Sequence, residues 1–125
     1  MYEFPKREHI VSTRLIETLF GSGSISMAAF PLRAVCHVVE RSQTDVPVQL
    51  LISVPKKRFK HAVDRNRVKR QVREAYRHHK QLLSDAVPAD KSLLVGFVWT
   101  SDQLAPSALV ASRVEKLVKR IAEKV

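Results

Sequence analysis

The residues best suited to chemistry lie between Arg65 and Arg77, where six cationic side chains accompany a single acid, Glu74. The cations are Arg65, Arg67, Lys69, Arg70, Arg73 and Arg77. Like charges this close repel one another, and a polyanion relieves the repulsion when these side chains replace its condensed counterions. The pattern therefore predicts a nucleic-acid contact, whereas an ordinary solvated helix surface usually mixes both signs.

A helix would place these cations together on one surface. No glycine or proline occurs from Ala62 to His79, and we predict a helix of about five turns there. Its apolar stripe recurs at helical spacing and should face a core: Val68, Val72, Ala75 and Tyr76. The opposite side carries Asn66, Arg70, Arg73 and Arg77. The helix is thus expected to be buried along one side and charged along the other.

This ordered string resembles a known signature. Arg65-Asn66-Arg67, Val68-Lys69-Arg70 and Arg73-Glu74-Ala75-Tyr76-Arg77 resemble the arginine-asparagine-arginine motif of the bacterial ribonuclease P protein subunit, and the upstream Lys56-Lys57 pair matches too. The resemblance implies a cofactor protein for a catalytic RNA that removes the 5′ leader from precursor tRNA. It implies that the RNA performs the hydrolysis and binds most of the Mg²⁺, so the protein is an endoribonuclease only within the ribonucleoprotein.

The resemblance also implies two sets of RNA-binding residues. The set implied to dock on the ribonuclease P RNA is Arg65, Asn66, Arg67, Lys69, Arg70 and Arg73. The set implied to hold the leader of precursor tRNA in a cleft is Phe20, Arg33, Ser53 and Lys56. Two positions depart from the family pattern, because Ile16 stands where a second cleft aromatic is expected and Leu51 where a small residue is common.

Composition limits the protein independently. A chain of 125 residues is expected to form one domain, residues 1–125, and its net charge of +10 favours nucleic acid as a partner. No apolar run approaches the ~20 residues of a membrane span, and no membrane partner is expected. The single cysteine, Cys36, favours a reducing, cytoplasmic location and a buried side chain without a redox or metal role.

Periodicity predicts an α+β protein. We expect a helix at 9–20, two strands within 24–40 broken near Phe30-Pro31, a strand at 48–54, the helix at 62–79, a strand at 92–100 and a final helix after Pro106. This order indicates a sandwich of one four-stranded sheet against helices. A crossover between parallel strands is right-handed in about 98% of cases, but the resemblance implies a left-handed one here.

Alternation within the strands assigns their faces. In the second strand, one face should carry Leu32, Ala34, Cys36 and Val38, and the other Arg33, Val35, His37 and Val39. Arg33 is a candidate RNA contact on the second face, whereas His37 has no evident partner in the sequence. Trp99 lies in a strongly apolar strand and is expected to be packed instead of serving as a stacking platform.

Other functions are less consistent with the sequence. Side-chain cleavage of RNA needs two histidines with an orienting partner, but the five histidines lie on different elements, and the twelve acids are scattered. A structural RNA-binding protein, such as a small ribosomal protein, would share the charge and fold class and remains the alternative. A DNA-binding module is disfavoured because no helix and turn precede the basic helix at helix-turn-helix spacing.

Overall fold

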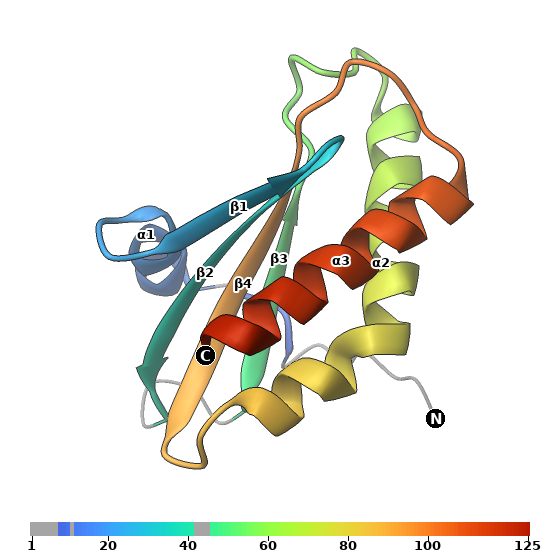
Figure 1. Cartoon of the computed structure of the whole chain (residues 1–125). Helices are drawn as coiled ribbons and strands as arrows, with labels where there is room; N and C mark the ends of the chain where they lie inside the picture. Colours follow the sequence, from blue (N-terminus) through green and yellow to red (C-terminus); the bar gives the residue numbers. More distant parts are fainter. Residues whose placement is uncertain (1–7, 11, 42–45) are drawn as a thin grey trace.

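The computed structural model describes residues 8–10, 12–41 and 46–125. Its elements follow the order α1 (Thr13–Phe20), β1 (Ile25–Ala29), β2 (Leu32–Glu40), β3 (Val48–Ser53), α2 (Ala62–Ala86), β4 (Lys91–Trp99) and α3 (Ser107–Lys124). The strands form one sheet in the order β1-β2-β4-β3. Figure 1 shows α2 and α3 on one face of this sheet and α1 on the other. The predicted α+β order is confirmed.

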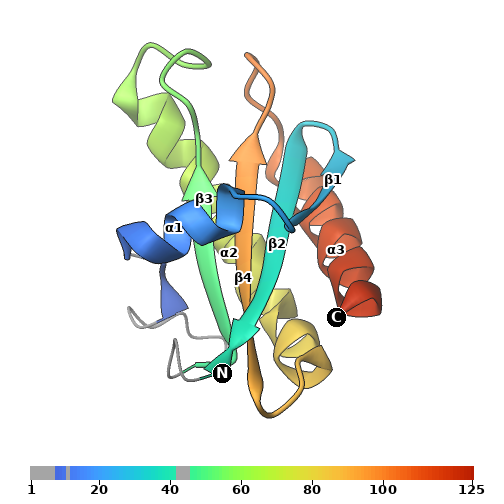
Figure 2. The ribbon, with the colours of Figure 1, turned by 90° about the vertical axis from the view of Figure 1, so that its left-hand side faces the viewer.

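The crossover from β3 to β4 is left-handed. These two strands are parallel neighbours, with Val48 paired to Leu93 and Ser53 to Val98. In Figure 2, α1 faces the viewer, α2 lies behind the sheet, and the chain passes from β3 on the left to β4 on its right. A connection that runs behind the sheet and advances to the right has the uncommon hand, as the resemblance implied.

Two hydrophobic cores hold the three layers together. The larger core joins the sheet to α2 and α3, and it buries the predicted stripe of Val68, Val72, Ala75 and Tyr76. The smaller core joins the sheet to α1 through Leu15, Leu19, Val35, Val39 and Leu94 together with Ile10. Both faces of the sheet are therefore covered in part, which explains why β4 is apolar along almost its whole length.

Local sequence explains where the helices begin and end. α1 begins after Ser12, whose hydroxyl accepts a hydrogen bond from the Leu15 N–H at 3.4 Å, so His9 lies outside the helix and instead bridges to Leu50 of β3. α2 continues to Ala86, seven residues beyond the predicted end at His79. Leu83 adds another buried position to its apolar stripe, and Pro88 follows the helix.

The face assignments in β2 were right except at one position. Leu32, Ala34 and Cys36 lie in the larger core, as expected for that face. Val38 belongs to the same alternation but is 40% exposed, because it lies toward the end of the strand, outside the core built by α2 and α3. Trp99 is buried against the larger core, so its predicted packing role is confirmed.

Candidate nucleic-acid interface

The charged side of α2 is exposed near the start of the helix. Asn66, Arg67, Arg70 and Arg73 are exposed, and Lys69 is half-buried at their edge. Within the described residues, none of these cations takes part in an ion pair. Their positive charge is therefore available to a partner molecule, which is the arrangement that the sequence predicted for a nucleic-acid contact.

Arg65 has a different environment from its neighbours in the motif. It is half-buried, and its Nη1 donates hydrogen bonds to the carbonyl oxygens of Phe59 at 2.8 Å and Lys60 at 3.3 Å. Those residues lie in the loop between β3 and α2, and Phe59 is packed in the larger core. Arg65 therefore fixes the path of the loop, a role that the spacing of the motif did not indicate.

The one acid between Arg65 and Arg77 binds two neighbouring side chains near the middle of α2. Glu74 accepts a hydrogen bond from Arg77 Nη1 at 2.7 Å and lies 3.2 Å from Nε2 of His78. Arg77 is thus paired, although the sequence pattern grouped it with Arg70 and Arg73. The unpaired cations of this helix surface are concentrated in its first four turns.

Strand register brings two of the expected cleft residues into one row. Ser53 of β3 is opposite Val98 of β4, and Val98 is opposite Arg33 of β2. All three face the side of the sheet that carries α1, and Arg33 is exposed. Its Nε donates a hydrogen bond to the Ser26 hydroxyl at 2.8 Å, which holds the guanidinium over the sheet. This row, Ser53-Val98-Arg33, is called the cleft row below.

Phe20 lies beside the cleft row at the end of α1. Its side chain is 48% exposed, so it is not a core residue, and its Cζ would lie 3.5 Å from a Cβ built on Gly96. Gly96 precedes Val98 by two residues on the same face of β4. The ring therefore lies over the sheet with much of its surface open, as a base-stacking side chain requires.

The two departures from the family pattern both serve packing. Ile16 and Leu51 are partly buried and pack against the smaller core beneath α1. The larger side chain at position 51 therefore adds to the packing beneath α1. The stacking function expected at position 16 is consequently not supported by an aromatic ring in this chain.

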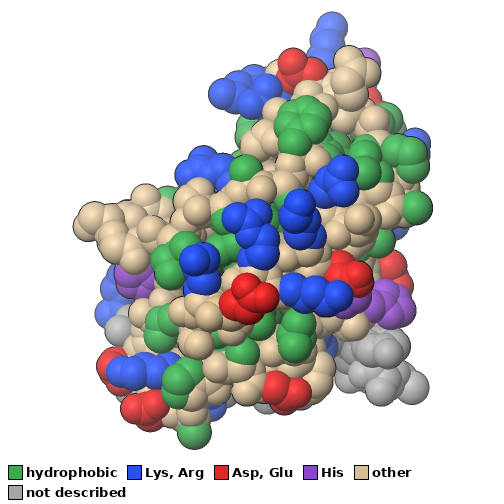
Figure 3. All heavy atoms as spheres, in the orientation of Figure 1, with side chains coloured by type: hydrophobic (Ala, Val, Ile, Leu, Met, Phe, Trp, Pro, Cys, Tyr) green, Lys and Arg blue, Asp and Glu red, His purple; other side chains and the backbone are tan. Residues whose placement is uncertain are grey.

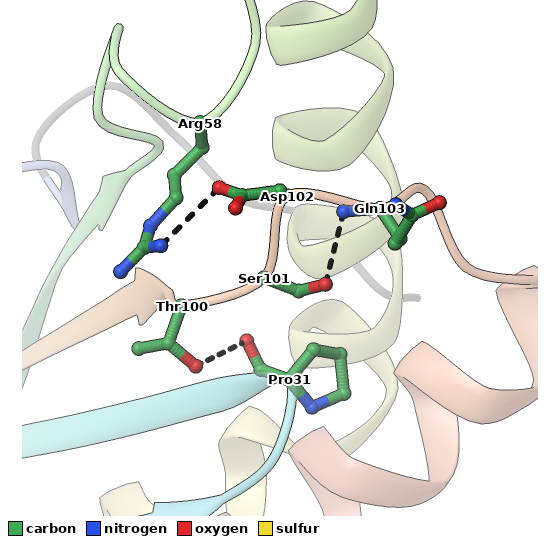
Figure 4. A network of polar contacts seen from close by, with 6 residues as sticks. All are labelled: Pro31, Arg58, Thr100, Ser101, Asp102 and Gln103. Carbon is green, nitrogen blue, oxygen red and sulfur yellow. Dashed lines mark hydrogen bonds and ion pairs between the residues drawn. The ribbon is translucent and has the colours of Figure 1, made fainter.

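The loop from Val54 to His61 joins the cleft row to the basic helix. Lys56 is exposed and follows Ser53 by three residues, so its charge lies beyond the end of β3 and before the start of α2. Arg58 is bound by Asp102 at 3.2 Å, which ties this loop to the connection between β4 and α3 (Figure 4). Lys56 therefore lies in the loop that connects Ser53 of the cleft row to the basic residues of α2.

Some residues have surroundings that the sequence did not indicate. His37 has a partner, because its Nδ1 lies 3.2 Å from the Ser24 hydroxyl. Val98 and Ser26 belong to the cleft surface, and the alternation of β4 and β1 could have identified both.

Burial raises the pKa of the Cys36 thiol, and the side chain is enclosed, as predicted for a small apolar residue.

A metal-binding cluster and a membrane-spanning helix are both absent from the residues that the structure describes. Among them, no three His, Cys, Asp or Glu side chains come together as a possible metal-binding group. None of the helices there combines the length and the apolar character that crossing a bilayer requires.

Comparison with known proteins identifies the family. The family model described as Ribonuclease P matches residues 4–122. The ribonuclease P protein component of Porphyromonas gingivalis is 38% identical over 118 residues, covering 94% of this chain and 85% of that protein. The corresponding protein of Chlorobaculum tepidum is 32% identical over 118 residues, covering 89% and 76%.

Solved structures share the fold at lower identity. The RNase P protein of Thermotoga maritima superimposes with a TM-score of 0.68 at 20% identity, over 90% of this chain and 96% of that one. An RNase P protein structure from Staphylococcus aureus gives 0.64 at 22% identity, over 91% and 94%. The helix and strand order described above is therefore that of these structures.

Proposed function

This chain belongs to the Ribonuclease P family, and from that premise we propose which parts of its surface bind which of two RNAs. The family acts in tRNA 5′ processing as a ribonucleoprotein, and the RNA subunit performs the endonucleolytic hydrolysis. The protein component contributes RNA binding. The proposal concerns which residues bind which RNA, with the whole chain, residues 1–125, acting as one domain.

The basic surface of α2 docks on the ribonuclease P RNA in this proposal. Arg67, Lys69, Arg70 and Arg73 contact phosphates, and Asn66 supplies a neutral donor and acceptor suited to a 2′-hydroxyl. Arg65 acts mainly by holding the preceding loop, through its bonds to the carbonyls of Phe59 and Lys60. The observation that carries the assignment is the unpaired state of the four cations, beside a neighbour, Arg77, that is neutralised.

The surface beside α1 holds the 5′ leader of precursor tRNA. Phe20 stacks on a base, Arg33 and Lys56 bind phosphates, and Ser53 donates or accepts a hydrogen bond at the floor of the cleft. The cleft row and the half-exposed ring support this assignment, since stacking and charge together suit single-stranded RNA of varied sequence. The same contacts would be poorly suited to a duplex.

Mg²⁺ enters this proposal through the RNA. Bound to the RNA subunit, Mg²⁺ would polarise a phosphate and activate a water molecule. The protein's cations lower repulsion between the catalytic RNA and precursor tRNA, and this raises both substrate affinity and the occupancy of Mg²⁺ sites at a given magnesium concentration. The protein then acts without touching the scissile bond. The cytoplasm, where tRNA is processed, is its proposed location.

Reconstitution tests this function. The purified chain is added to a bacterial ribonuclease P RNA at a magnesium concentration too low for the RNA to act alone, with precursor tRNA as substrate. We expect leader cleavage to be restored, and the protein without the RNA to be inactive. Cleavage by the protein alone would instead indicate a side-chain nuclease, and binding to the RNA without restored cleavage would favour a general structural RNA-binding protein.

A further inference from the structure

α3 carries a second row of cations, distinct from the surface of α2. Arg113, Lys116, Arg120 and Lys124 recur at i, i+3, i+7 and i+11, so they share one side of the helix and span about 16 Å at 1.5 Å per residue. Figure 3 shows blue side chains following the course of α3 across this face of the molecule. These four residues are called the α3 row below.

In the part of the chain that the structure describes, the two acids of α3, Glu115 and Glu123, form no ion pair with this row. Glu115 pairs with Lys119 at 3.8 Å, and Glu123 lines a hollow between α3 and α2 together with Lys119. None of the ion pairs within the described residues includes a member of the α3 row. The side of α3 near β1, a helix that the structure describes in full, thus carries cations that form no ion pair with Glu115 or Glu123.

Two members of the row are held in place by the edge strand β1 and the turn that follows it. Arg113 Nε donates to the carbonyl oxygen of Phe30 at 3.0 Å, and Arg120 Nη1 donates to that of Ala28 at 3.1 Å. Covering the open edge of β1 is one function of these arginines. It uses one hydrogen bond from each guanidinium, which has five N–H donors, and it gives no role to Lys116 or Lys124.

An apolar hollow lies where the α3 row begins. Its volume is about 340 Å³, and Phe30, Leu104, Leu109 and Arg113 are among the residues that line it. Phe30 is 69% exposed and Leu104 39%, so an aromatic ring and an aliphatic side chain are open to solvent beside a guanidinium. This combination suits a stacked base whose phosphate lies on the arginine.

The walls of this hollow are fixed by hydrogen bonds between distant parts of the chain. The carbonyl of Pro31 accepts bonds from the Thr100 N–H at 2.9 Å and from the Thr100 hydroxyl at 3.1 Å, the latter drawn in Figure 4. Gln71 of α2 donates from Nε2 to the carbonyl of Ala105 at 2.9 Å. The turn after β1 and the connection before α3 are therefore joined, and the hollow is formed before any ligand arrives.

We propose that the α3 row and the adjacent hollow form a second binding surface for single-stranded RNA. One base stacks on Phe30, and the following phosphates lie along Arg113, Lys116, Arg120 and Lys124. The row is about 16 Å long, so a short single-stranded segment of a few nucleotides would be enough to follow it. An acidic peptide could bind the charge, but regular charges next to an open aromatic ring fit a nucleic-acid strand better.

This surface is separate from the one proposed for the leader and the catalytic RNA. In the sheet order β1-β2-β4-β3, the α3 row lies along the β1 edge, whereas the loop before α2 leaves from β3 at the opposite edge. The α3 row also lies on the helical face of the sheet, across from α1 and the cleft row. The protein could consequently hold a further RNA segment while its other surface is occupied.

Site-resolved binding tests this inference. The full ¹⁵N-labelled chain is titrated with an octauridine RNA and, separately, with a glutamate-rich peptide that contains one phenylalanine, while amide shifts are recorded by NMR. We expect the RNA to shift residues around Phe30 and along α3, as a group distinct from those near α1 and α2. RNA shifts confined to α1, the cleft row and α2, or α3 shifts produced by the peptide alone, would overturn the proposal.

Variants identify the side chains responsible. Phe30→Ala should weaken RNA binding at the α3 surface about fivefold or more, as the loss of one stacked base predicts. Lys116→Ala with Lys124→Ala should reduce the slope of log affinity against log salt by about 1.4, from two single-strand phosphate contacts. Neither lysine side chain forms an ion pair or a hydrogen bond within the described residues, so the fold should be unaffected, which the thermal midpoint checks.

Lys119→Ala is the matched control. This lysine lies on the same helix, is exposed, and pairs with Glu115 on the other side. Its replacement should leave RNA affinity at the α3 surface and its salt slope unchanged. An effect equal to that of the lysine pair would mean that only net charge matters, and it would remove the basis for a defined surface.

Discussion

Arg77 donates a hydrogen bond from Nη1 to Oε2 of Glu74 at 2.7 Å, and the ion pair leaves this arginine less able to bind a phosphate than Arg73 one turn earlier. A neutralised and an unpaired arginine thus occupy the same helix surface. This difference allows the docking surface to be tested within a single element.

Replacing Arg70 and Arg73 by alanine should weaken binding to ribonuclease P RNA and reduce its salt dependence. If the start of α2 neutralises four or five phosphates, the slope of log affinity against log salt from this element is about −3 to −4. The double variant should therefore flatten the slope by about 1.5 to 2. Filter binding over a series of salt concentrations measures it.

Arg77→Ala is the internal control for that experiment. Because Arg77 is already paired, its loss should change the slope by much less than the loss of Arg73, even though Glu74 is released. Equal effects of the Arg73 and Arg77 substitutions would contradict the assignment of the docking surface to the first turns of α2.

Phe20→Ala should lower the affinity of the holoenzyme for precursor tRNA that carries a leader. The loss of one stacked base corresponds to about 1–3 kcal/mol. Phe20→Leu should recover little of it, since an aliphatic side chain fills the space without offering a ring. Affinity for mature tRNA, which has no leader, is the control, and a similar loss there would place Phe20 outside the leader site.

Gly96→Ala should destabilise the fold by about 1–3 kcal/mol. An added Cβ would lie 3.0 Å from Cδ2 of Leu19, a fully buried side chain that joins α1 to the sheet. Urea denaturation measures the loss. Leu19→Ala makes room for the methyl group, so the cost of Gly96→Ala should fall in that background, and strictly additive costs would show that the contact is not the cause.

The stability of the protein should decline in alkaline solution through Tyr76. Burial, and next the negative charge of Glu8, raise the pKa of this phenol above its usual range. The folded state then keeps the phenol neutral, while the unfolded chain ionises near its ordinary pKa of about 10. The stability is fully present below that pH and decreases as the pH rises above it.

Tyr76→Phe removes this titration. Thermal midpoints measured between pH 8 and about 11 should fall less steeply for the variant than for the parent chain. The lysines titrate in both proteins, so the difference between the two curves isolates Tyr76. Parallel curves would mean that the phenol ionises equally well in the folded state.

Much of the fold was predictable because its signals are local. The helical stripe of Val68, Val72 and Tyr76 and the alternation of β2 identified the core faces directly, apart from Val38. The end of α2 was missed because Leu83 continues the stripe through a polar stretch. The exposure of Val38 was missed because it depends on where the helices end across the sheet, which a strand's own pattern does not contain.

The candidate site was predictable in its residues but not in its geometry. The motif identified the cations, yet the contact of Arg65 with Phe59 depends on how a loop folds back onto α2. Likewise, alternation assigned Arg33 to one face of its strand, but only the register through Val98 places it in one row with Ser53. Pairing between distant strands and loop closure are the two kinds of information that sequence periodicity lacks.

The attachment of Arg120 to the Ala28 carbonyl of β1, and of Arg113 to the Phe30 carbonyl just after it, has a consequence for self-association. An uncovered outer strand offers its backbone to another polypeptide, and stacking of copies through such strands leads to fibrils. Before RNA binds, these two guanidinium groups repel other copies of the positively charged chain. They also occupy backbone carbonyl acceptors that a second copy would need for strand pairing. The chain's positive charge therefore protects the unassembled subunit as well as attracting its partner.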